Sequence, residues 1–152
     1  MIYSGDLHPG DIVELGSAKV TDAEVIEFAS RYDPQSFHLD DELGRQTGLG
    51  GLVASGWHTA AIFQRLLVDG LLADAAVEGS PGLERLHWPV PVRPGDVLTG
   101  RLTVERIGPS LSRRDCKLLC LRCELVNSVE EPVLQMTLDV LFRDRAAAGG
   151  GA

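Results

Sequence analysis

The segment from Gly56 to about Leu72 is the feature that most restricts how this chain can fold, because it has the pattern of a long helix with apolar residues on most of its sides. The apolar residues of the segment are Trp57, Ala60, Ala61, Ile62, Phe63, Leu66, Leu67 and Leu71. Such a helix is stable in water only where other elements cover it. We therefore expect the rest of the chain to bury this helix deeply.

Three extended segments in the second half of the chain can supply this cover. We predict them from Val97 to about Ile107, from Arg114 to Asn127 and from Val133 to Phe142, after a loose region from Asp74 to Gly82. In the last segment, apolar residues occupy every second position, which is the period of a strand with one buried face. Short turns join the segments, so we expect antiparallel pairing. A long helix beside such strands predicts an α+β fold, with an antiparallel sheet wrapped around a long central helix.

The size and charge of the chain exclude several classes of protein. A chain of 152 residues with 44% hydrophobic residues suits one domain, which we place at residues 1–145. The small residues of the tail, 146–152, predict disorder. A formal net charge of −8 argues against a nucleic-acid binder, which needs a basic surface. No apolar run approaches the roughly 18 residues of a membrane span, and the first residues do not resemble a leader, so we expect a cytoplasmic protein without membrane contact.

Cys116, Cys120 and Cys123 have the spacing with which radical S-adenosylmethionine enzymes hold an iron–sulfur cluster. They lie in a predicted strand, where Cys116 and Cys120 share one face and Cys123 lies on the other. A cluster needs three thiolates that converge, so thiolates on opposite faces do not suit it. We therefore predict buried, reduced thiols and no metal site.

Asp33 and His38 lie five positions apart and offer a carboxylate and an imidazole for acid and base chemistry. A helix from about Asp22 to Tyr32, with Thr21 as its N-cap, leads directly to Asp33. The apolar side of this helix is formed by Val25, Phe28, Ala29 and Tyr32. Pro34 then discourages a helix, because it fixes its own φ and pushes Asp33 out of the α region. We therefore predict that both side chains lie on a tight loop, where catalytic groups concentrate.

Three stretches of the chain match the pattern of one known family. Asp33 to His38 reads Asp-Pro-Gln-Ser-Phe-His, Gly50 to His58 is a glycine-rich entry to the long helix, and Pro91 to Asp96 opens a strand. On these stretches the chain resembles the MaoC-like dehydratases, the (R)-specific enoyl-CoA hydratase group of the hotdog fold, over nearly its whole length. The family motif is Asp, any residue, Asn, Pro, an aliphatic residue and His. Gln35 and Ser36 replace its Asn and Pro, which bears on substrate choice more than on reaction type.

The resemblance implies a reaction and assigns roles in it. The reaction is the reversible hydration of trans-2-enoyl-CoA to (R)-3-hydroxyacyl-CoA. Asp33 and His38 would hold and activate the water, and the backbone N–H of Gly56 would stabilise negative charge on the thioester oxygen. Coenzyme A would be the handle of the substrate, so the resemblance implies no cofactor and no metal. It also implies a homodimer or a dimer of dimers, with active sites at or near the dimer interface.

Four further residues are candidates for binding the acyl-CoA substrate. Gln35 carries the amide of the family's asparagine on one more methylene and could orient the reacting groups. Ser55 is either an N-cap only or also a substrate contact, and Trp57 is either a core residue or a limit to the acyl pocket. Arg93 could meet the phosphates of coenzyme A. His58, in the first turn of the long helix, is expected to pack or to bond locally.

Two other functions remain open on the same fold. A hotdog thioesterase would place a carboxylate against the thioester carbonyl, but the long helix has no acidic residue before Asp69, and His38 would have no role. A non-catalytic acyl-CoA-binding or partner subunit would keep the fold without the chemistry, and the two replaced motif residues leave room for it. Taken singly, Asp33 also fits a turn before Pro34, and His38 also fits a hydrogen-bonded core histidine.

Overall fold

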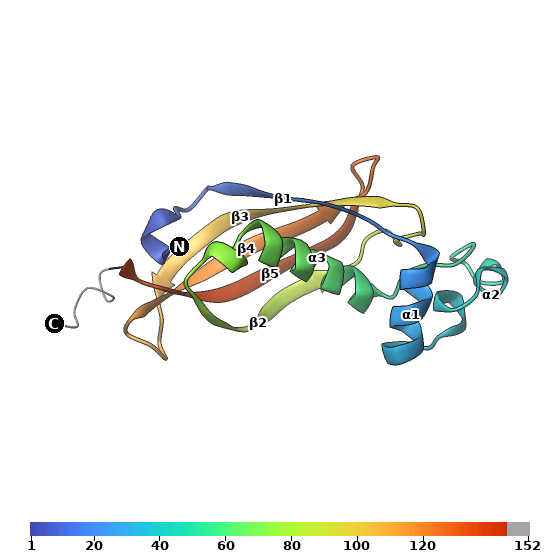
Figure 1. Cartoon of the computed structure of the whole chain (residues 1–152), viewed down its shortest axis with the longest axis horizontal. Helices are drawn as coiled ribbons and strands as arrows, with labels where there is room; N and C mark the ends of the chain where they lie inside the picture. The colour runs from blue at the N-terminus through green and yellow to red at the C-terminus, as the bar shows by residue number, and fades with distance from the viewer. Residues whose placement is uncertain (146–152) are drawn as a thin grey trace.

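A computed structural model describes residues 1–145 of the chain, so the disorder predicted for residues 146–152 lies outside the described residues. Five strands form one sheet, and the long helix α3 lies across one of its faces (Figure 1). The strands are β1 (Ile12–Lys19), β2 (Val77–His87), β3 (Val97–Pro109), β4 (Cys116–Val126) and β5 (Pro132–Arg143). The α-helices are α1 (Asp22–Tyr32), α2 (Asp41–Arg45) and α3 (Gly56–Gly70), and the short 3-10 helices are η1 (Ser4–Asp6), η2 (Ser36–His38) and η3 (Leu72–Asp74).

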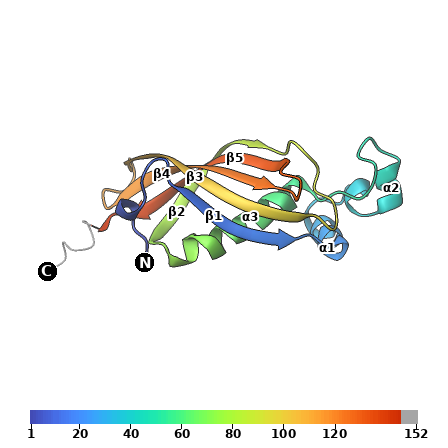
Figure 2. The ribbon, with the colours of Figure 1, turned by 90° about the horizontal axis from the view of Figure 1, so that it is seen from above.

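The sheet has the strand order β1-β3-β4-β5-β2, and every neighbouring pair of strands is antiparallel. The strands β3, β4 and β5 form its centre, and β1 and β2 form its two edges. Figure 2 shows α3 on one side of the sheet, with α1 and α2 beyond one end of it. The predicted α+β fold and the antiparallel pairing of the three central strands are thus confirmed.

The core lies between α3 and the sheet face that it covers. Phe63 and Leu67 of α3 are fully buried, as is Leu121 in the centre of the sheet, and all three belong to one hydrophobic cluster. The helix lies close to the sheet near Gly100, where an added Cβ would lie 3.3 Å from Leu66 Cδ1. Glycine at this point lets the helix and the strand come together.

The expectation that α3 is covered on most of its sides is wrong for this chain. Trp57 is 59% exposed, and Ala61 is also exposed. The outward side also carries Arg65 and Asp69, whose side chains pair over 2.7 Å. The helix packs through one side only, because the single sheet covers one side of it. No helix within residues 1–145 combines the length and the apolar character that crossing a bilayer requires.

Three elements were not predicted from the sequence: the edge strands β1 and β2 and the short helix α2. The region 74–82, expected to be loose, contains the start of β2 at Val77. Gly79, Pro81 and Gly82 interrupt the two-residue period there, and the register of β2 against β5 shifts at three places. The central strands, whose alternation is regular, end within two residues of their predicted limits.

Helix α1 begins and ends where it was predicted, but its apolar side is smaller. Thr21 Oγ1 accepts a hydrogen bond from the Glu24 backbone N–H over 3.2 Å, which confirms the N-cap. Val25 and Ala29 are buried, whereas Tyr32 is exposed. The expected core position of Tyr32 is wrong, because α1 lies beyond the end of the sheet, where less of its surface is covered.

The three cysteines are free and buried, as predicted. Cys123 belongs to the core cluster under α3, whereas Cys116 and Cys120 lie outside that cluster. Burial raises the pKa of the Cys123 thiol to about 12, so the thiol stays protonated at neutral pH. Within the described part of the chain, no group of three His, Cys, Asp or Glu side chains is arranged to hold a metal ion.

Candidate active site

Asp33 lies at the point where α1 ends. Its backbone N–H donates to the Ala29 carbonyl over 2.9 Å, and its φ of −152° and ψ of 67° are no longer helical. Pro34 follows and cannot continue the helix. The Gln35 backbone N–H then donates to the Asp33 carbonyl over 2.8 Å and closes a tight turn. The local chain therefore holds the Asp33 side chain on a short, ordered connection.

His38 ends the 3-10 helix η2 and is buried. Its Nδ1 lies 2.7 Å from the carbonyl oxygen of Val53. A carbonyl only accepts, so Nδ1 carries a proton and donates it to Val53. The other ring nitrogen, Nε2, lies 3.3 Å from Asp33 Oδ2. The carboxylate and the imidazole that the sequence singles out are therefore neighbours in space.

Two side chains donate hydrogen bonds to the Asp33 carboxylate. Ser55 Oγ donates to Oδ2 over 2.7 Å, and Gln35 Nε2 donates to Oδ1 over 2.8 Å. The hydrogen bond from Ser55 lowers the pKa of Asp33 most, and Gln35 and His38 lower it further, while partial burial opposes them. Asp33 is therefore an anion at neutral pH, with its position fixed from two directions.

Ser55 is fully buried and is the N-cap of α3. Its Oγ accepts a hydrogen bond from the Trp57 backbone N–H over 3.3 Å, which confirms the predicted capping role. The same hydroxyl gives its proton to Asp33. One side chain therefore connects the start of α3 to the end of α1, and its contact with substrate stays a prediction.

Gly56 is the first residue of α3. Its backbone N–H has no hydrogen-bond partner within residues 1–145, as is usual in the first turn of a helix. An added Cβ would lie 2.5 Å from the ring of Trp88, so this position is closed to any side chain unless Trp88 moves. A free N–H at the positive end of a 15-residue helix is suited to stabilise an anion.

Two other predicted site residues, Trp57 and Arg93, lie at the surface. Trp57 packs edge to face on Trp88, with ring centroids 5.3 Å apart, so its predicted core position is wrong. Arg93 is exposed, and its Nη2 donates to the Leu49 carbonyl over 2.5 Å. This bond joins Arg93 to the glycine-rich loop before α3. Contact of either side chain with the substrate stays a prediction.

Val53 and Trp88 take part in this arrangement although the sequence did not indicate them. Val53 acts through its backbone carbonyl, and it lies 15 positions from His38, so no side-chain pattern marks it. Trp88 lies against Gly56 and Trp57 after the end of β2. Trp88 is one of only two tryptophans in the chain, and this rarity is the one feature of the sequence that could have marked it as a candidate.

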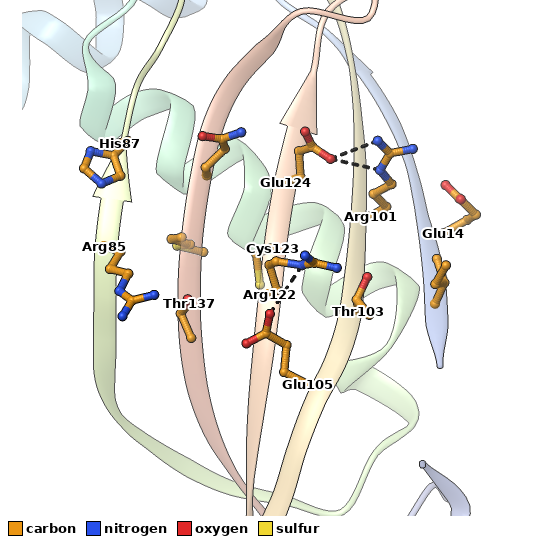
Figure 3. Close-up of a pocket in the computed structure, with 13 residues that line it drawn as sticks. Glu14, Arg85, His87, Arg101, Thr103, Glu105, Arg122, Cys123, Glu124 and Thr137 are labelled. Carbon is orange, nitrogen blue, oxygen red and sulfur yellow. Dashed lines mark hydrogen bonds and ion pairs between the residues drawn. The ribbon is translucent and has the colours of Figure 1, made fainter. Parts of the chain in front are cut away.

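A hollow of about 660 Å³ lies on the sheet face turned away from α3 (Figure 3). Its charged side chains pair across the strands: Arg101 Nη2 lies 2.9 Å from Glu124 Oε2, and Arg122 Nε lies 3.5 Å from Glu105 Oε1. Neighbouring opposite charges of this kind stabilise a solvated sheet face. None of the predicted site residues lines this hollow, which is therefore separate from the pair Asp33 and His38.

Comparison with known proteins shows the family of the chain. The sequence model described as "MaoC like domain" matches residues 7–115, which include α1, the loop from Asp33 to His38, and α3. The chain is 41% identical to the MaoC-like dehydratase from Rhodospirillum rubrum, with a TM-score of 0.87. That match covers 95% of this chain and 99% of the other.

Two more distant structures share the fold. One is the R-hydratase PhaJ1 from Pseudomonas aeruginosa, 18% identical with a TM-score of 0.75, over 95% of this chain and 87% of that one. The other is Rv0216 from Mycobacterium tuberculosis, a double hotdog fold, 19% identical with a TM-score of 0.78, over 93% of this chain and 44% of that one. The predicted hotdog fold is thus confirmed, and the chain belongs to the MaoC-like dehydratase family.

Proposed function

We propose that the protein catalyses the reversible hydration of trans-2-enoyl-CoA to (R)-3-hydroxyacyl-CoA. The observation that carries this proposal is the 3.3 Å approach of His38 Nε2 to Asp33 Oδ2. A carboxylate and an imidazole at this separation can act on one water molecule, which is what hydration requires. Membership of the MaoC-like dehydratase family supports the same class of reaction.

Both atoms that face the water are hydrogen-bond acceptors. Asp33 Oδ2 belongs to an ionised carboxylate, and His38 Nε2 is the unprotonated nitrogen when Nδ1 donates to Val53. A water between them can donate one proton to each atom and direct a lone pair at C3 of the enoyl group. The pair would thus fix both the position and the orientation of the nucleophile.

The proton and electron movements follow from the basicity of the two groups. As the oxygen–C3 bond forms, the π electrons of the C2–C3 double bond move towards the thioester oxygen, and His38 takes a proton from the water. We assign this transfer to His38 because two hydrogen bonds already stabilise Asp33 as an anion and weaken it as a base. The enolate then takes a proton from His38 at C2, which returns the pair to its starting state. Dehydration follows the same steps in reverse.

The remaining site residues would serve the thioester end of the substrate. The free N–H of Gly56 would donate to the thioester oxygen as negative charge accumulates there. Gln35 and Ser55 would act by holding Asp33, and Arg93 and Trp57 would contact the coenzyme A portion or the acyl group. Hydration changes no oxidation state and transfers only the elements of water, so we propose no cofactor beyond the coenzyme A of the substrate.

The test is to supply crotonyl-CoA and follow the absorbance of the conjugated enoyl group beside a reagent that detects free thiol. Loss of the enoyl absorbance without free thiol supports hydration, and chiral chromatography of the product should give the (R)-3-hydroxy isomer. Release of free thiol would instead support the thioesterase. No reaction with enoyl thioesters of several chain lengths would support the non-catalytic binding subunit and would reject our proposal.

A further inference from the structure

A second hollow, of about 380 Å³, lies in the cleft between α1 and α3. Its apolar walls include Phe28 and Tyr32 of α1 and Ile62 and Leu66 of α3. The cleft is therefore shaped by the two helices that carry the candidate site: α1 ends at Tyr32, directly before Asp33, and α3 begins at Gly56.

His58 is the polar side chain enclosed within this apolar cleft. Its side chain lines the hollow, is only 8% exposed, and stacks on Phe28 with ring centroids 4.9 Å apart and planes at 9°. Its Nδ1 is inaccessible to solvent and has no hydrogen-bond partner, and neither ring nitrogen is bonded to another residue within residues 1–145. A buried polar group without a partner costs stability, so a native structure rarely keeps one without a use.

The chemistry of His58 indicates which group it would bind. Burial lowers the pKa of His58, and the charge of Glu24 opposes this only in part, so the imidazole is neutral at neutral pH. A neutral imidazole has one donor and one acceptor nitrogen. Because Nδ1 is closed to solvent, a ligand would bond through Nε2, and a hydroxyl group, which both donates and accepts, matches that nitrogen in either tautomer.

A carboxylate ligand fits the cleft less well than a hydroxyl. The rim carries both signs of charge, with Lys19 and Arg31 opposed by Glu24 and Glu27. Arg65, at the same rim, is already paired with Asp69 over 2.7 Å. The charges at the rim therefore do not favour an anionic ligand. The neutral ring of His58 also carries no positive charge that could bind a carboxylate.

The position of His58 relates the cleft to the candidate site. Tyr32, which lines the hollow, directly precedes Asp33, and His58 lies in the first turn of α3, so the cleft lies beside the end of α1 and the start of α3. The acyl chain of a thioester bound at Asp33 and His38 would thus enter the cleft past Tyr32. The apolar walls suit the methylenes of such a chain, and the imidazole suits a polar group on it.

We propose that the α1–α3 cleft binds the acyl tail of the substrate and that His58 selects tails that carry a hydroxyl group. The substrate class is therefore the hydroxylated 2-enoyl thioesters, in place of simple alkyl ones. This inference rests on the proposed function, since it assumes that the thioester is bound at Asp33, His38 and Gly56.

The experiment compares trans-2-hexenoyl-CoA with its 5-hydroxy and 6-hydroxy derivatives, on the wild-type protein and on His58→Leu. A site built to hydrogen-bond a hydroxyl rejects the analogue without it, so the wild type should show kcat/KM at least about 10-fold higher for one hydroxylated thioester. In His58→Leu this ratio should fall to about 1 or below. His8→Leu, which changes a histidine on the exposed N-terminal segment, is the matched control and should keep the wild-type ratio.

A binding measurement separates failure of the cleft from failure of the reaction. Saturated 6-hydroxyhexanoyl-CoA cannot be hydrated, and its binding should shift the imidazole ¹⁵N resonance of His58, one of only four histidines in the chain. Hydration of all three thioesters with equal efficiency, or an unchanged ratio in His58→Leu, would overturn the cleft proposal and leave the hydratase standing. A His58 shift without hydration of any thioester would support the cleft and reject the hydratase, and absence of both would reject both.

Discussion

The candidate site depends on a carboxylate that has two hydrogen-bond donors of its own, one on each oxygen. Ser55 and Gln35 approach Asp33 from the protein, and His38 approaches Oδ2 at 3.3 Å. A residue held in this way loses little orientational freedom when substrate binds. The individual contributions of these contacts are therefore measurable by substitutions that change one atom.

Asp33→Asn should remove hydration activity while the protein stays folded. The amide keeps the shape of the side chain but is neutral and has only one acceptor oxygen, so it holds the attacking water less well, and kcat/KM should fall by about 10²–10⁴-fold. Steady-state kinetics with crotonyl-CoA would measure the loss, and thermal unfolding would show a midpoint close to that of the wild type. Asp74→Asn, an exposed change in η3, should keep full activity. Full activity in Asp33→Asn would remove Asp33 from the mechanism.

Ser55→Ala should move the acidic limb of the kcat/KM profile to higher pH. The hydrogen bond from Ser55 is the main cause of the lowered pKa of Asp33, so its loss raises that pKa, and the carboxylate is protonated at a higher pH. A lowered folded-state pKa gives stability that is present above the unfolded pKa and is lost as pH falls through the folded one. Unfolding curves should therefore show that this pH-dependent loss of stability is smaller in the variant and is complete at a higher pH.

The control for Ser55→Ala is Ser4→Ala. Ser4 is also a buried serine, but its hydroxyl has no hydrogen-bond partner within residues 1–145, so its removal should leave the pH profile in place. An acidic limb that does not move in Ser55→Ala would mean that this limb reports a group other than Asp33.

At the scale of the elements, the start of α3 brings together Gly56, the N-cap Ser55 and the indole ring of Trp88. Gly56→Ala would place a methyl group 2.5 Å from the ring of Trp88. Overpacking of this kind costs about 1–3 kcal/mol, and the shift of the helix start should also lower kcat. Urea unfolding should show the destabilisation, whereas Gly48→Ala, where an added Cβ meets nothing within 4 Å, should be nearly neutral.

A double-mutant cycle assigns the cause of that destabilisation. If the contact with Trp88 is responsible, Gly56→Ala should cost less free energy of unfolding in a Trp88→Ala background than in the wild type. Equal costs in both backgrounds would show that the two positions are not coupled and that the destabilisation has a cause other than the contact with Trp88.

The elements also show what the sequence could and could not predict. The strands β3, β4 and β5 were predictable because their buried residues alternate regularly, whereas β2 contains Gly79, Pro81 and Gly82 and has no such period.

Within the candidate site, Asp33 and His38 are close in sequence and were predicted together. Ser55 lies 22 positions from Asp33, so its bond to that carboxylate arises only when α1 packs near α3. Local patterns therefore indicated the candidate acid and base, and only tertiary packing shows the residues that hold them.

At the scale of the whole molecule, the sheet has two edge strands, β1 and β2, and Ile12 on β1 is 65% exposed. Leu83 on β2 is 45% exposed, and the exposed pair Trp57 and Trp88 lies where β2 ends. An open strand edge with exposed apolar side chains pairs readily with another chain. These features support the homodimer that we expect, with β2 of two chains side by side.

Light scattering at micromolar concentration should therefore give a mass at least twice the 16.4 kDa of one chain. Leu83→Lys places a charge on the edge strand, which natural edges use to prevent pairing, and it should shift the protein towards one chain per particle. Leu111→Lys, a fully exposed leucine in the connection between β3 and β4, should leave the mass unchanged. A wild-type mass of one chain would reject the dimer. A wild-type dimer that persists in Leu83→Lys would place the interface away from β2, since a lysine facing its own copy across a paired edge brings like charges together.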